Sequence, residues 1–547
     1  MIRFRFVVLA VTFVLCLAGV AALAAEDDLT EAPRSPSRAR GEGPFDQLVL
    51  RGVTVIDGTG APARGPMDIV IEGNRIVRMR SVGAPGTPID PERRPVAAEG
   101  ATVLDLQGHY VLPGFVDLHG HLGGSIRETP AEYVLKLWMG HGITTASDPG
   151  SSNGLEWTLD HKRRSEANEI TAPRLHVESS FGQDNDGPIT NAEEARAWVR
   201  FTKSRGADGI KFFGARPDIM EAALDEADQL GLYTTCHHAQ LHVVGQNALD
   251  SARMGLTSMQ HWYGLPEAMF DGQLVQDYPV GYDYNNEQDR FSEAGRLWRQ
   301  ASPPFSDKWN AVMDELVDLD FTIVPTFHAY EATRDLSRMM RAEWHEFYTL
   351  PSLWRFYLPD RLAHASYWFY WGTEEEVSWR ENYHLWMTFI NEFKNRRGRV
   401  AIGSDSGYSF NLYGFSFVRE MELLREAGFH PLEVIKAATL NGAQALGMAD
   451  RIGTVEPGKL ADLVIVDENP LENLKVLYGI GALKLTSDNE IVRVGGIKYT
   501  IKDGIVFDAP ELLADVRRMV REAKDAQGYE ITIPGLSYED GVVSLDE

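Results

Sequence analysis

A pair of histidines, His119 and His121, directly follows an apolar run that ends at Leu118. On a β-strand, side chains two positions apart point to the same side. Neutral imidazole is also the most common protein ligand for transition metals. The pair is therefore typical of one half of a metal site, although isolated pairs of this kind are also found on surfaces. The remaining ligands are expected further along the chain.

Further candidate ligands each stand at the end of another apolar run: Lys211, the neighbours His237 and His238, His261, and Asp405. Strand alternation lets only one of His237 and His238 point toward a shared metal. Taken alone, each histidine fits a structural role and Asp405 fits a helix cap. Together, ligand types at the ends of several strands predict one metal centre.

Lys211 lies among Ile and Phe residues, where a charged amine is costly unless its charge is paired or removed. One interpretation is a buried pair with a carboxylate. The other is an amine whose pKa is lowered by burial, so that it reacts with CO2. The resulting carbamate carries a carboxylate that can bridge two divalent ions.

The elements that must position these residues alternate along the chain. Helix-like stretches at 191–205, 218–230 and 415–427 separate strand-like runs at 115–119, 144–147, 174–178, 209–213, 233–238, 258–261, 322–325 and 400–404. This pattern predicts an α/β protein with a parallel (β/α)8 TIM barrel over residues 111–448. Barrel enzymes place their chemistry at the C-terminal ends of the strands, where the candidate ligands stand.

Short strand-like segments flank the barrel region on both sides. Residues 46–110 and 449–508 are rich in such segments, separated by Gly and Pro. We expect them to form one small β-sandwich assembled from both ends of the chain. Residues 509–547 form a C-terminal tail with a helix-like stretch at 511–526, to which the sequence assigns no function.

The N-terminus has the pattern of an export signal. Arg3 and Arg5 precede an apolar stretch at 6–23, and Ala22-Leu23-Ala24 offers small residues for cleavage. The alternative is a membrane anchor, since the stretch is long enough to span a bilayer. The acidic residues that follow favour a cleaved signal peptide over residues 1–24, then a flexible leader at 25–45. The mature protein is expected to be periplasmic or secreted and not membrane-bound.

Charge and cysteine content narrow the range of partners. Removing Arg3 and Arg5 with the signal, and no acid, takes the net charge from −26 to −28. This acidity argues against binding to nucleic acid or to an anionic membrane. Cys236 is then the one cysteine left, so an intrachain disulfide is excluded. A small-molecule substrate is expected, and a homo-oligomer is compatible with the sequence.

Several segments together resemble the amidohydrolase superfamily over about residues 46–508, namely 112–121, 209–211, 403–405, 437–443 and 453–463. The sequence is most similar to the imidazolonepropionase-related and prolidase-like branch with a bridging lysine. The resemblance implies a buried ion held by His119, His121, Lys211 and Asp405. It implies an outer ion held by Lys211, His261 and one of the paired histidines. His238 is expected to be that ligand because His238-Ala239 matches the family's His-Ala pair.

The resemblance also implies a reaction. Two ions, zinc by preference with manganese, cobalt or iron also suitable, would lower the pKa of a water that attacks a carbonyl. Asp405 would take the proton of this water and return it to the leaving amine. The expected activity is hydrolysis of amide, peptide-like or cyclic amide C–N bonds. Alternatives are hydrolysis of lactones or phosphotriesters, and a non-catalytic metal-binding scaffold.

Two predicted loops, 262–321 and 326–398, are long enough to set specificity. Aromatic residues crowd 344–386, which predicts a helical subdomain with its own core or an oligomer interface. The sharper interpretation is a lid over a pocket for a bulky group. The candidate substrate-binding residues are His328, Tyr330 and His237, the member of the histidine pair that is not assigned to the metal.

Overall fold

The fold is taken from a computed structural model that describes residues 33–124, 129–358, 367–368 and 370–532. The predicted signal peptide at 1–24 lies outside the described residues. Among the helices within the described ranges, none combines the length and apolar character needed to cross a membrane.

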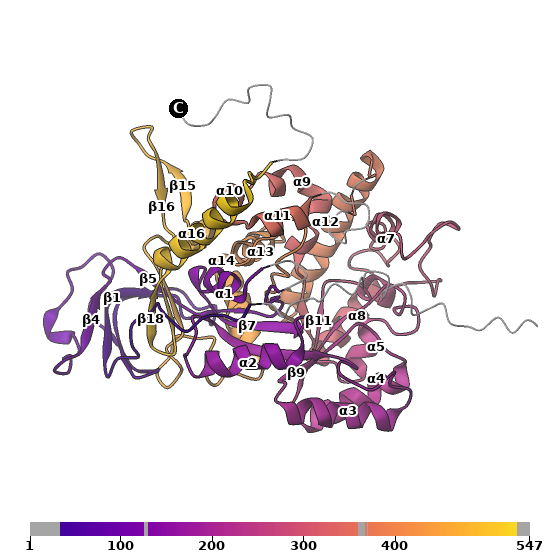
Figure 1. The fold of residues 1–547 in the computed structure, drawn as a ribbon, viewed down its shortest axis with the longest axis horizontal. Coiled ribbons are helices and arrows are strands. Elements are labelled where there is room, and N and C mark those ends of the chain that lie inside the picture. The colour runs from indigo at the N-terminus through magenta and orange to yellow at the C-terminus, as the bar shows by residue number, and fades with distance from the viewer. Residues whose placement is uncertain (1–32, 125–128, 359–366, 369, 533–547) are drawn as a thin grey trace, which may run out of the picture.

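Eight parallel strands form a TIM-barrel-like sheet at the centre of the molecule (Figure 1). In order they are β6 (Phe115–Asp117), β7 (Ile143–Gly150), β8 (Arg174–Ser180), β9 (Gly209–Phe212), β10 (Tyr233–His237), β11 (Ser258–Gln260), β12 (Thr322–Val324) and β13 (Arg399–Val400). The segments that follow β6 and β13 remain adjacent to each other, because Leu118 N donates to Ile402 O and Asp405 N donates to His119 O. The predicted alternation of strands and helices is confirmed.

Helices cover the outside of the sheet, and their limits follow local sequence signals. The bounds are α1 (Ala131–Gly140), α2 (Leu155–Glu166), α3 (Ala192–Arg205), α4 (Pro217–Gln229), α5 (Ala248–Arg253), α13 (Phe415–Glu426), α14 (Pro431–Ala438) and α15 (Leu440–Ala445). In α3, the Asn191 side chain accepts from Glu194 N at the start. Gly206 ends the helix with φ 106°, a conformation that favours glycine.

The two long loops are largely helical. The first holds α6 (Leu265–Ala268), α7 (Glu287–Ala294) and α8 (Asp307–Asp318), and the second holds α9 (Ala332–Met340), α10 (His345–Tyr348), α11 (Pro351–Tyr357) and α12 (Thr373–Asn395). Trp379, Tyr383 and Trp386 of α12 are fully buried and belong to the same hydrophobic core as the barrel. The aromatic segment therefore shares the main core, and the expectation of a separate core is wrong.

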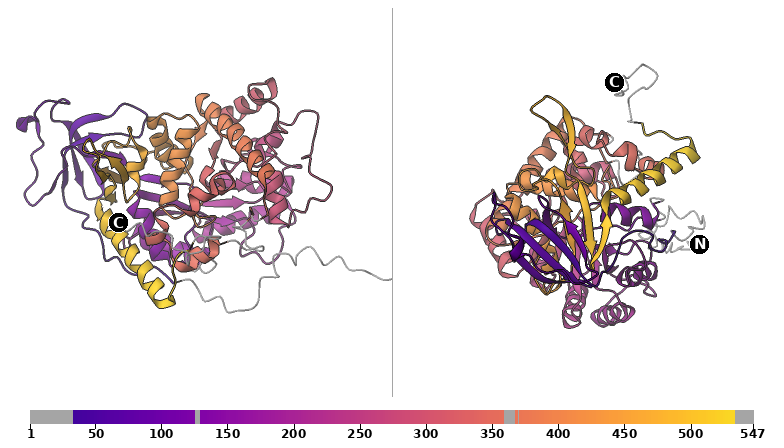
Figure 2. Two further views of the ribbon diagram at one scale, coloured as in Figure 1. Left: turned by 90° about the horizontal axis from the view of Figure 1, so that it is seen from above. Right: turned by 90° about the vertical axis from the view of Figure 1, so that its left-hand side faces the viewer.

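Strands from both ends of the chain meet in one mixed sheet, which Figure 2 shows beside the barrel. Its order is β18 (Ile505–Asp508), β17 (Ile497–Lys502), β14 (Leu463–Val466), β5 (Tyr110–Pro113), β1 (Leu48–Val55), β2 (Arg64–Glu72) and β3 (Arg75–Ser81), with β4 (Thr102–Asp105) also on β1. The pairing of β14 with β5 joins the two chain ends. The expectation that strands from both ends of the chain come together is confirmed by this sheet, and a separate two-layer sandwich domain stays a prediction.

The predicted leader packs on the barrel over its described part, residues 33–45. Ser35 is buried and its N–H donates to His161 Nε2, and Arg38 N donates to Glu169 O. A bridge joins Glu42 to Val506 in β18. The expectation of a flexible leader is wrong here, because backbone and side-chain partners on the barrel fix a segment whose composition alone suggested a linker.

The C-terminal tail begins as α16 (Ala509–Gln527), which lies against α1. Asp515 of α16 accepts from Lys136 Nζ of α1 at 2.9 Å and from Arg40 Nη2 at 2.9 Å. Hydrogen bonding from Arg40 is the main reason that the pKa of Asp515 lies well below its usual range. This carboxylate therefore joins the tail, the leader and the barrel.

Replacing Asp515 with asparagine is expected to lower the free energy of unfolding at pH 7 by about 2 to 3 kcal/mol. The loss is smaller than for a fully unpaired buried charge because Glu132 still contacts Lys136. Since the folded pKa of Asp515 is below the unfolded one, its stabilisation is present above about pH 4 and is lost as the pH falls. Urea unfolding at pH 7, 5 and 3 should show the difference from wild type narrowing, with the exposed Asp525→Asn change in the same helix as the neutral control.

Candidate metal centre

The histidine pair is held in place at the end of β6. Asp117 accepts from His119 N at 3.0 Å, and also from Ser404 N at 2.9 Å and Ser404 Oγ at 2.6 Å. It thus fixes the two segments that carry His119 and Asp405. Burial raises the pKa of Asp117 to about 6. Gly120 faces away from the histidines, and a Cβ there would come within 2.8 Å of the Trp138 ring.

Asp405 is the meeting point of three imidazoles. Its Oδ1 lies 2.9 Å from His121 Nε2 and 3.4 Å from His119 Nε2, and its Oδ2 lies 3.9 Å from His261 Nδ1. Burial alone would raise the pKa of Asp405, but these imidazoles hold it well below its usual range. The carboxylate is therefore ionised and faces the histidines with both oxygens.

An unusual backbone conformation orients the side chains of His261 and Asp405. His261 has φ 67° and Asp405 has φ 47°, in the left-handed region that costs energy for residues other than glycine. His261 directly follows β11, and Asp405 lies five residues after the end of β13, so in both cases the turn redirects a side chain that regular alternation would place elsewhere. Such strain is tolerated when the surroundings fix the residue, and it is concentrated at functional sites.

The structure reverses the expected assignment of the paired histidines. His237 lines the cavity, and its ring centroid lies 4.5 Å from that of His261. His238 points away, toward α5, where its Nε2 lies 2.9 Å from Ser251 Oγ. The reason is register, because Thr235 pairs with Lys211 and His237 shares the face of Thr235. His238 is therefore corrected to a structural residue.

Lys211 of β9 points into the same cavity and is buried. Its Nζ has no hydrogen-bond partner among the described residues, and burial lowers its pKa to about 8. Lys502 in the mixed sheet offers a contrast, since its equally buried Nζ donates to Ser165 O and Asn168 Oδ1. Lys211 is thus a buried amine that its own chain leaves unsatisfied.

The donor set fits divalent metal ions. Donor atoms of His119, His261 and Asp405 lie within 4.8 Å of one another, close enough to bind one ion. His119 Nδ1 and Lys211 Nζ are buried without partners in the described part of the chain. A mixed imidazole and carboxylate set suits zinc and neighbouring transition metals.

Around these groups lies a cavity of about 390 Å³, large enough for a small molecule. Besides the metal-type ligands and the predicted Tyr330, its lining includes Tyr367 of the predicted aromatic segment and residues that sequence reasoning missed: Phe213, Tyr284, Arg290, Phe291, Tyr408 and Ser409. Tyr284, Arg290 and Phe291 come from the first long loop, and Tyr367 from the second. Both loops therefore reach the centre, which fits the expected role of long loops in specificity.

His328 does not face this cavity. Its Nδ1 lies 2.7 Å from Glu331 Oε2, and its backbone N–H donates to Glu420 Oε2. It borders a neighbouring cavity, together with Arg419, which pairs with the same Glu331. The prediction that His328 binds substrate is corrected, because the turn after β12 directs Tyr330 inward and His328 outward.

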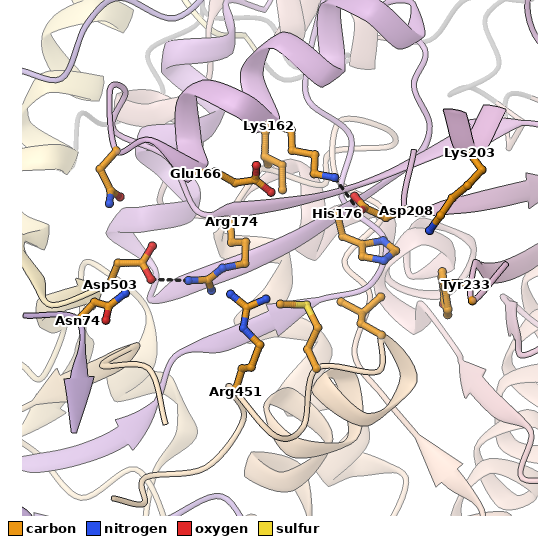
Figure 3. Close-up of a pocket in the computed structure, with 15 residues that line it drawn as sticks. Asn74, Lys162, Glu166, Arg174, His176, Lys203, Asp208, Tyr233, Arg451 and Asp503 are labelled. Carbon is orange, nitrogen blue, oxygen red and sulfur yellow. Dashed lines mark hydrogen bonds and ion pairs between the residues drawn. The ribbon is translucent and has the colours of Figure 1, made fainter. Parts of the chain in front are cut away.

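A second polar cavity, of about 500 Å³, lies at the opposite end of the strands (Figure 3). Arg174 and Tyr233 there are the first residues of β8 and β10. Arg174 pairs with Asp503 at 2.7 Å, and Lys162 pairs with Asp208 at 2.7 Å. The Arg174–Asp503 pair joins the barrel to the mixed sheet, and the Lys162–Asp208 pair lies within the barrel. No metal-type ligand named above lines this cavity.

Comparison with known proteins places the chain in context. Residues 390–507 match the Amidohydrolase family. Imidazolonepropionase from Thermoplasma acidophilum is 37% identical over 79 residues, 14% of this chain and 18% of that protein. The 5'-deoxyadenosine deaminase from Methanobrevibacter smithii is 30% identical over 145 residues, 23% of this chain and 32% of that protein. The chain thus spans under a third of the length of these relatives.

Solved structures share the fold over most of the chain. A Xaa-Pro dipeptidase with bound methionine matches with a TM-score of 0.54 at 18% identity, over 84% of this chain and 100% of that one. Bottromycin amidohydrolase matches with a TM-score of 0.58 at 20% identity, over 88% and 91%. At this identity the likeness concerns the fold alone. The chain is therefore similar to members of the amidohydrolase superfamily, in sequence over residues 390–507 and in fold over most of its length.

Proposed function

We propose that the protein is a metal-dependent hydrolase of C–N bonds in amide, peptide-like or cyclic amide substrates. The observation that carries this proposal is the position of Asp405, whose carboxylate faces His119, His121 and His261 beside the unsatisfied Lys211. These groups line a cavity at the C-terminal ends of the barrel strands, the end that barrel enzymes use for catalysis.

The proposed centre holds two divalent ions, zinc by preference. His119, His121, Lys211 and Asp405 would hold the more buried ion, and Lys211, His237 and His261 the outer one. Lys211 serves both after carbamylation, in which its neutral amine forms an N–C bond to CO2 and releases a proton. A pKa of about 8 leaves roughly half of this amine neutral at pH 8, which supports the reaction.

When bound, such ions supply Lewis acidity that lowers the pKa of water and polarises a carbonyl. Residues of the chain itself then transfer the proton and contact the substrate. Asp405 is ionised and can accept a proton from water at the cavity floor, then return it to the leaving amine. Tyr330 lies beside His261, with ring centroids 5.6 Å apart, and borders the space that a substrate would fill.

Export remains part of the proposal. A signal peptide at 1–24, followed by a mature chain with net charge −28, supports action on small molecules outside the cytoplasm. Residues 33–45, which follow the proposed cleavage point in the sequence, pack on the barrel, and this is compatible with removal of the signal peptide.

The deciding experiment is elemental analysis combined with hydrolysis assays on amides, cyclic amides, lactones and phosphotriesters. We expect about two transition-metal ions per chain and hydrolysis of C–N bonds that is lost with a chelator and restored by Zn²⁺. Hydrolysis confined to lactones or phosphotriesters would contradict the substrate assignment. Bound metal without turnover of any class would favour a binding scaffold instead.

The paired histidines provide an internal comparison. His237→Ala is expected to lower the bound metal by about one ion and the activity by at least about 10-fold, because it removes a proposed ligand. His238→Ala should keep the metal content, since that side chain faces Ser251. Metal analysis of both variants checks this. Loss of metal from His238→Ala with a normal His237→Ala would restore the original assignment.

A further inference from the structure

One cationic side chain in the cavity has no part in the proposed metal centre. Arg290 of α7 lines the cavity that contains His237, His261, Lys211 and Asp405. Its side chain is only 13% exposed. Arg290 comes from the long loop between β11 and β12, whereas the metal-type ligands come from the ends of the barrel strands.

Arg290 is fixed rather than free to swing. Its Nε donates to Gln240 Oε1 at 2.8 Å, and its Nη1 donates to Glu287 Oε1 at 3.2 Å. The guanidinium carbon lies 4.8 Å from the Tyr284 ring centroid and 5.1 Å from that of Phe291. Among the described residues, no hydrogen bond involves its Nη2. A preorganised guanidinium that lines the cavity therefore keeps donor capacity at Nη2.

The charges that line the cavity favour an anionic ligand at this point. Among the described residues, the ionisable lining residues other than histidine and tyrosine are Lys211, Asp405 and Arg290. The first two are committed to the metal centre under the proposed function. Within the described part of the chain, Arg290 forms an ion pair with Glu287, which is not one of the lining residues. A carboxylate is planar and matches the donor geometry of a guanidinium, whereas an amide lacks the charge.

The surrounding surface suits an organic acid. Four aromatic side chains line the same cavity as Arg290 and Asp405, namely those of Tyr284, Phe291, Tyr367 and Tyr408. Phe291 and Tyr367 stack with centroids 4.2 Å apart. Such walls exclude water and strengthen an ion pair formed within them. They also offer apolar contact to the part of a ligand that joins its carboxylate to the scissile bond.

We propose that Arg290 anchors a free carboxylate of the substrate, so that the preferred substrates are amides carrying a carboxylate, such as N-acyl amino acids. This inference rests on the proposed function and adds the substrate class to it. Arg290 is a specificity-determining residue, and the loop 262–321 is the element that provides the specificity.

The test uses the metal-loaded full chain and a library of N-acetyl amino acids, each paired with its neutral C-terminal N-methylamide. Wild type is expected to favour the carboxylate of a pair by about 100-fold in kcat/KM. Arg290→Gln should remove most of this preference through a higher KM, while rates on the N-methylamides change less than about 3-fold. Arg290→Lys should restore part of it. Arg299→Gln is the matched control, since Arg299 pairs with Glu381 at the surface.

Binding separates this inference from the proposed function. Calorimetry on the Asp405→Asn variant, alone and with Arg290→Gln, measures affinity for each pair without turnover. A carboxylate preference that depends on Arg290 but no amide hydrolysis by wild type would overturn the function and keep the anchor. Amide hydrolysis with equal losses on both members of a pair would overturn the anchor and keep the function. If the protein showed no preference for the carboxylate and no hydrolysis of amides, both the anchor and the proposed function would be overturned.

Discussion

Asp405→Asn is expected to lower kcat by about 10³- to 10⁴-fold while most of the bound metal is retained. Asparagine has the same shape and keeps an oxygen that can face His121 and His119, so the local packing survives. It cannot accept a proton from water at the pH of the assay. The proton transfer step is therefore lost, although the geometry around the centre is kept.

Elemental analysis and steady-state kinetics on the same preparation check this result. Asp320→Asn is a suitable control because Asp320 is an exposed carboxylate at the opposite end of β13, paired with Arg399. A kcat within about 10-fold of wild type in Asp405→Asn would contradict the role of Asp405 in proton transfer. Loss of both metal and activity would mean that Asp405 is required mainly to hold the ions, and the separate role in proton transfer would lose its support.

The fold and most of the centre could be predicted because they depend on short-range patterns. Continuous apolar runs separated by amphipathic stretches are typical of strands buried on both faces by helices, as in a parallel barrel. Polar residues that end such runs must lie at one end of the barrel. His119, His121, Lys211, His261 and Asp405 were located by this reasoning alone.

The paired histidines mark the limit of that reasoning. Alternation predicts that one of His237 and His238 points inward, but the choice depends on the register of β10 against β9, a contact between segments far apart in sequence. His328 and Tyr330 pose the same problem, because Thr326 with φ 51° turns the chain after β12. A local sequence pattern predicts neither the register of β10 against β9 nor the turn at Thr326.

Arg290 and Ser35 were missed for a different reason. Arg290 lies in a polar helix, and an arginine in such a segment is usually solvated. Arg290 becomes buried only because the loop folds over the ends of the barrel strands. Ser35 belongs to a segment whose composition is typical of a linker, and contacts with α2 fix it. Both depend on tertiary packing that no window of sequence contains.

Lys211→Met is expected to lower metal affinity and kcat/KM by more than about 100-fold, since removing residues that merely support metal ligands costs 10- to 100-fold. Methionine keeps the length and apolar stem of the side chain, so the fold should be unaffected. What disappears is the amine that reacts with CO2. The proposed carbamate can be observed by ¹³C NMR after growth or incubation with labelled bicarbonate.

Wild type should show one ¹³C carbamate signal that Lys211→Met lacks. Lys162→Met, at the opposite end of the barrel, should retain the signal, the metal and the activity. Acetate or formate should partly restore activity to a Lys211→Ala variant, because a small carboxylate can then fill the space between the ions. Full activity in wild type with no carbamate signal would favour the competing interpretation of Lys211 as one member of a buried pair with a carboxylate. Its lack of any hydrogen-bond partner among the described residues argues against that interpretation, because a buried ammonium normally has several.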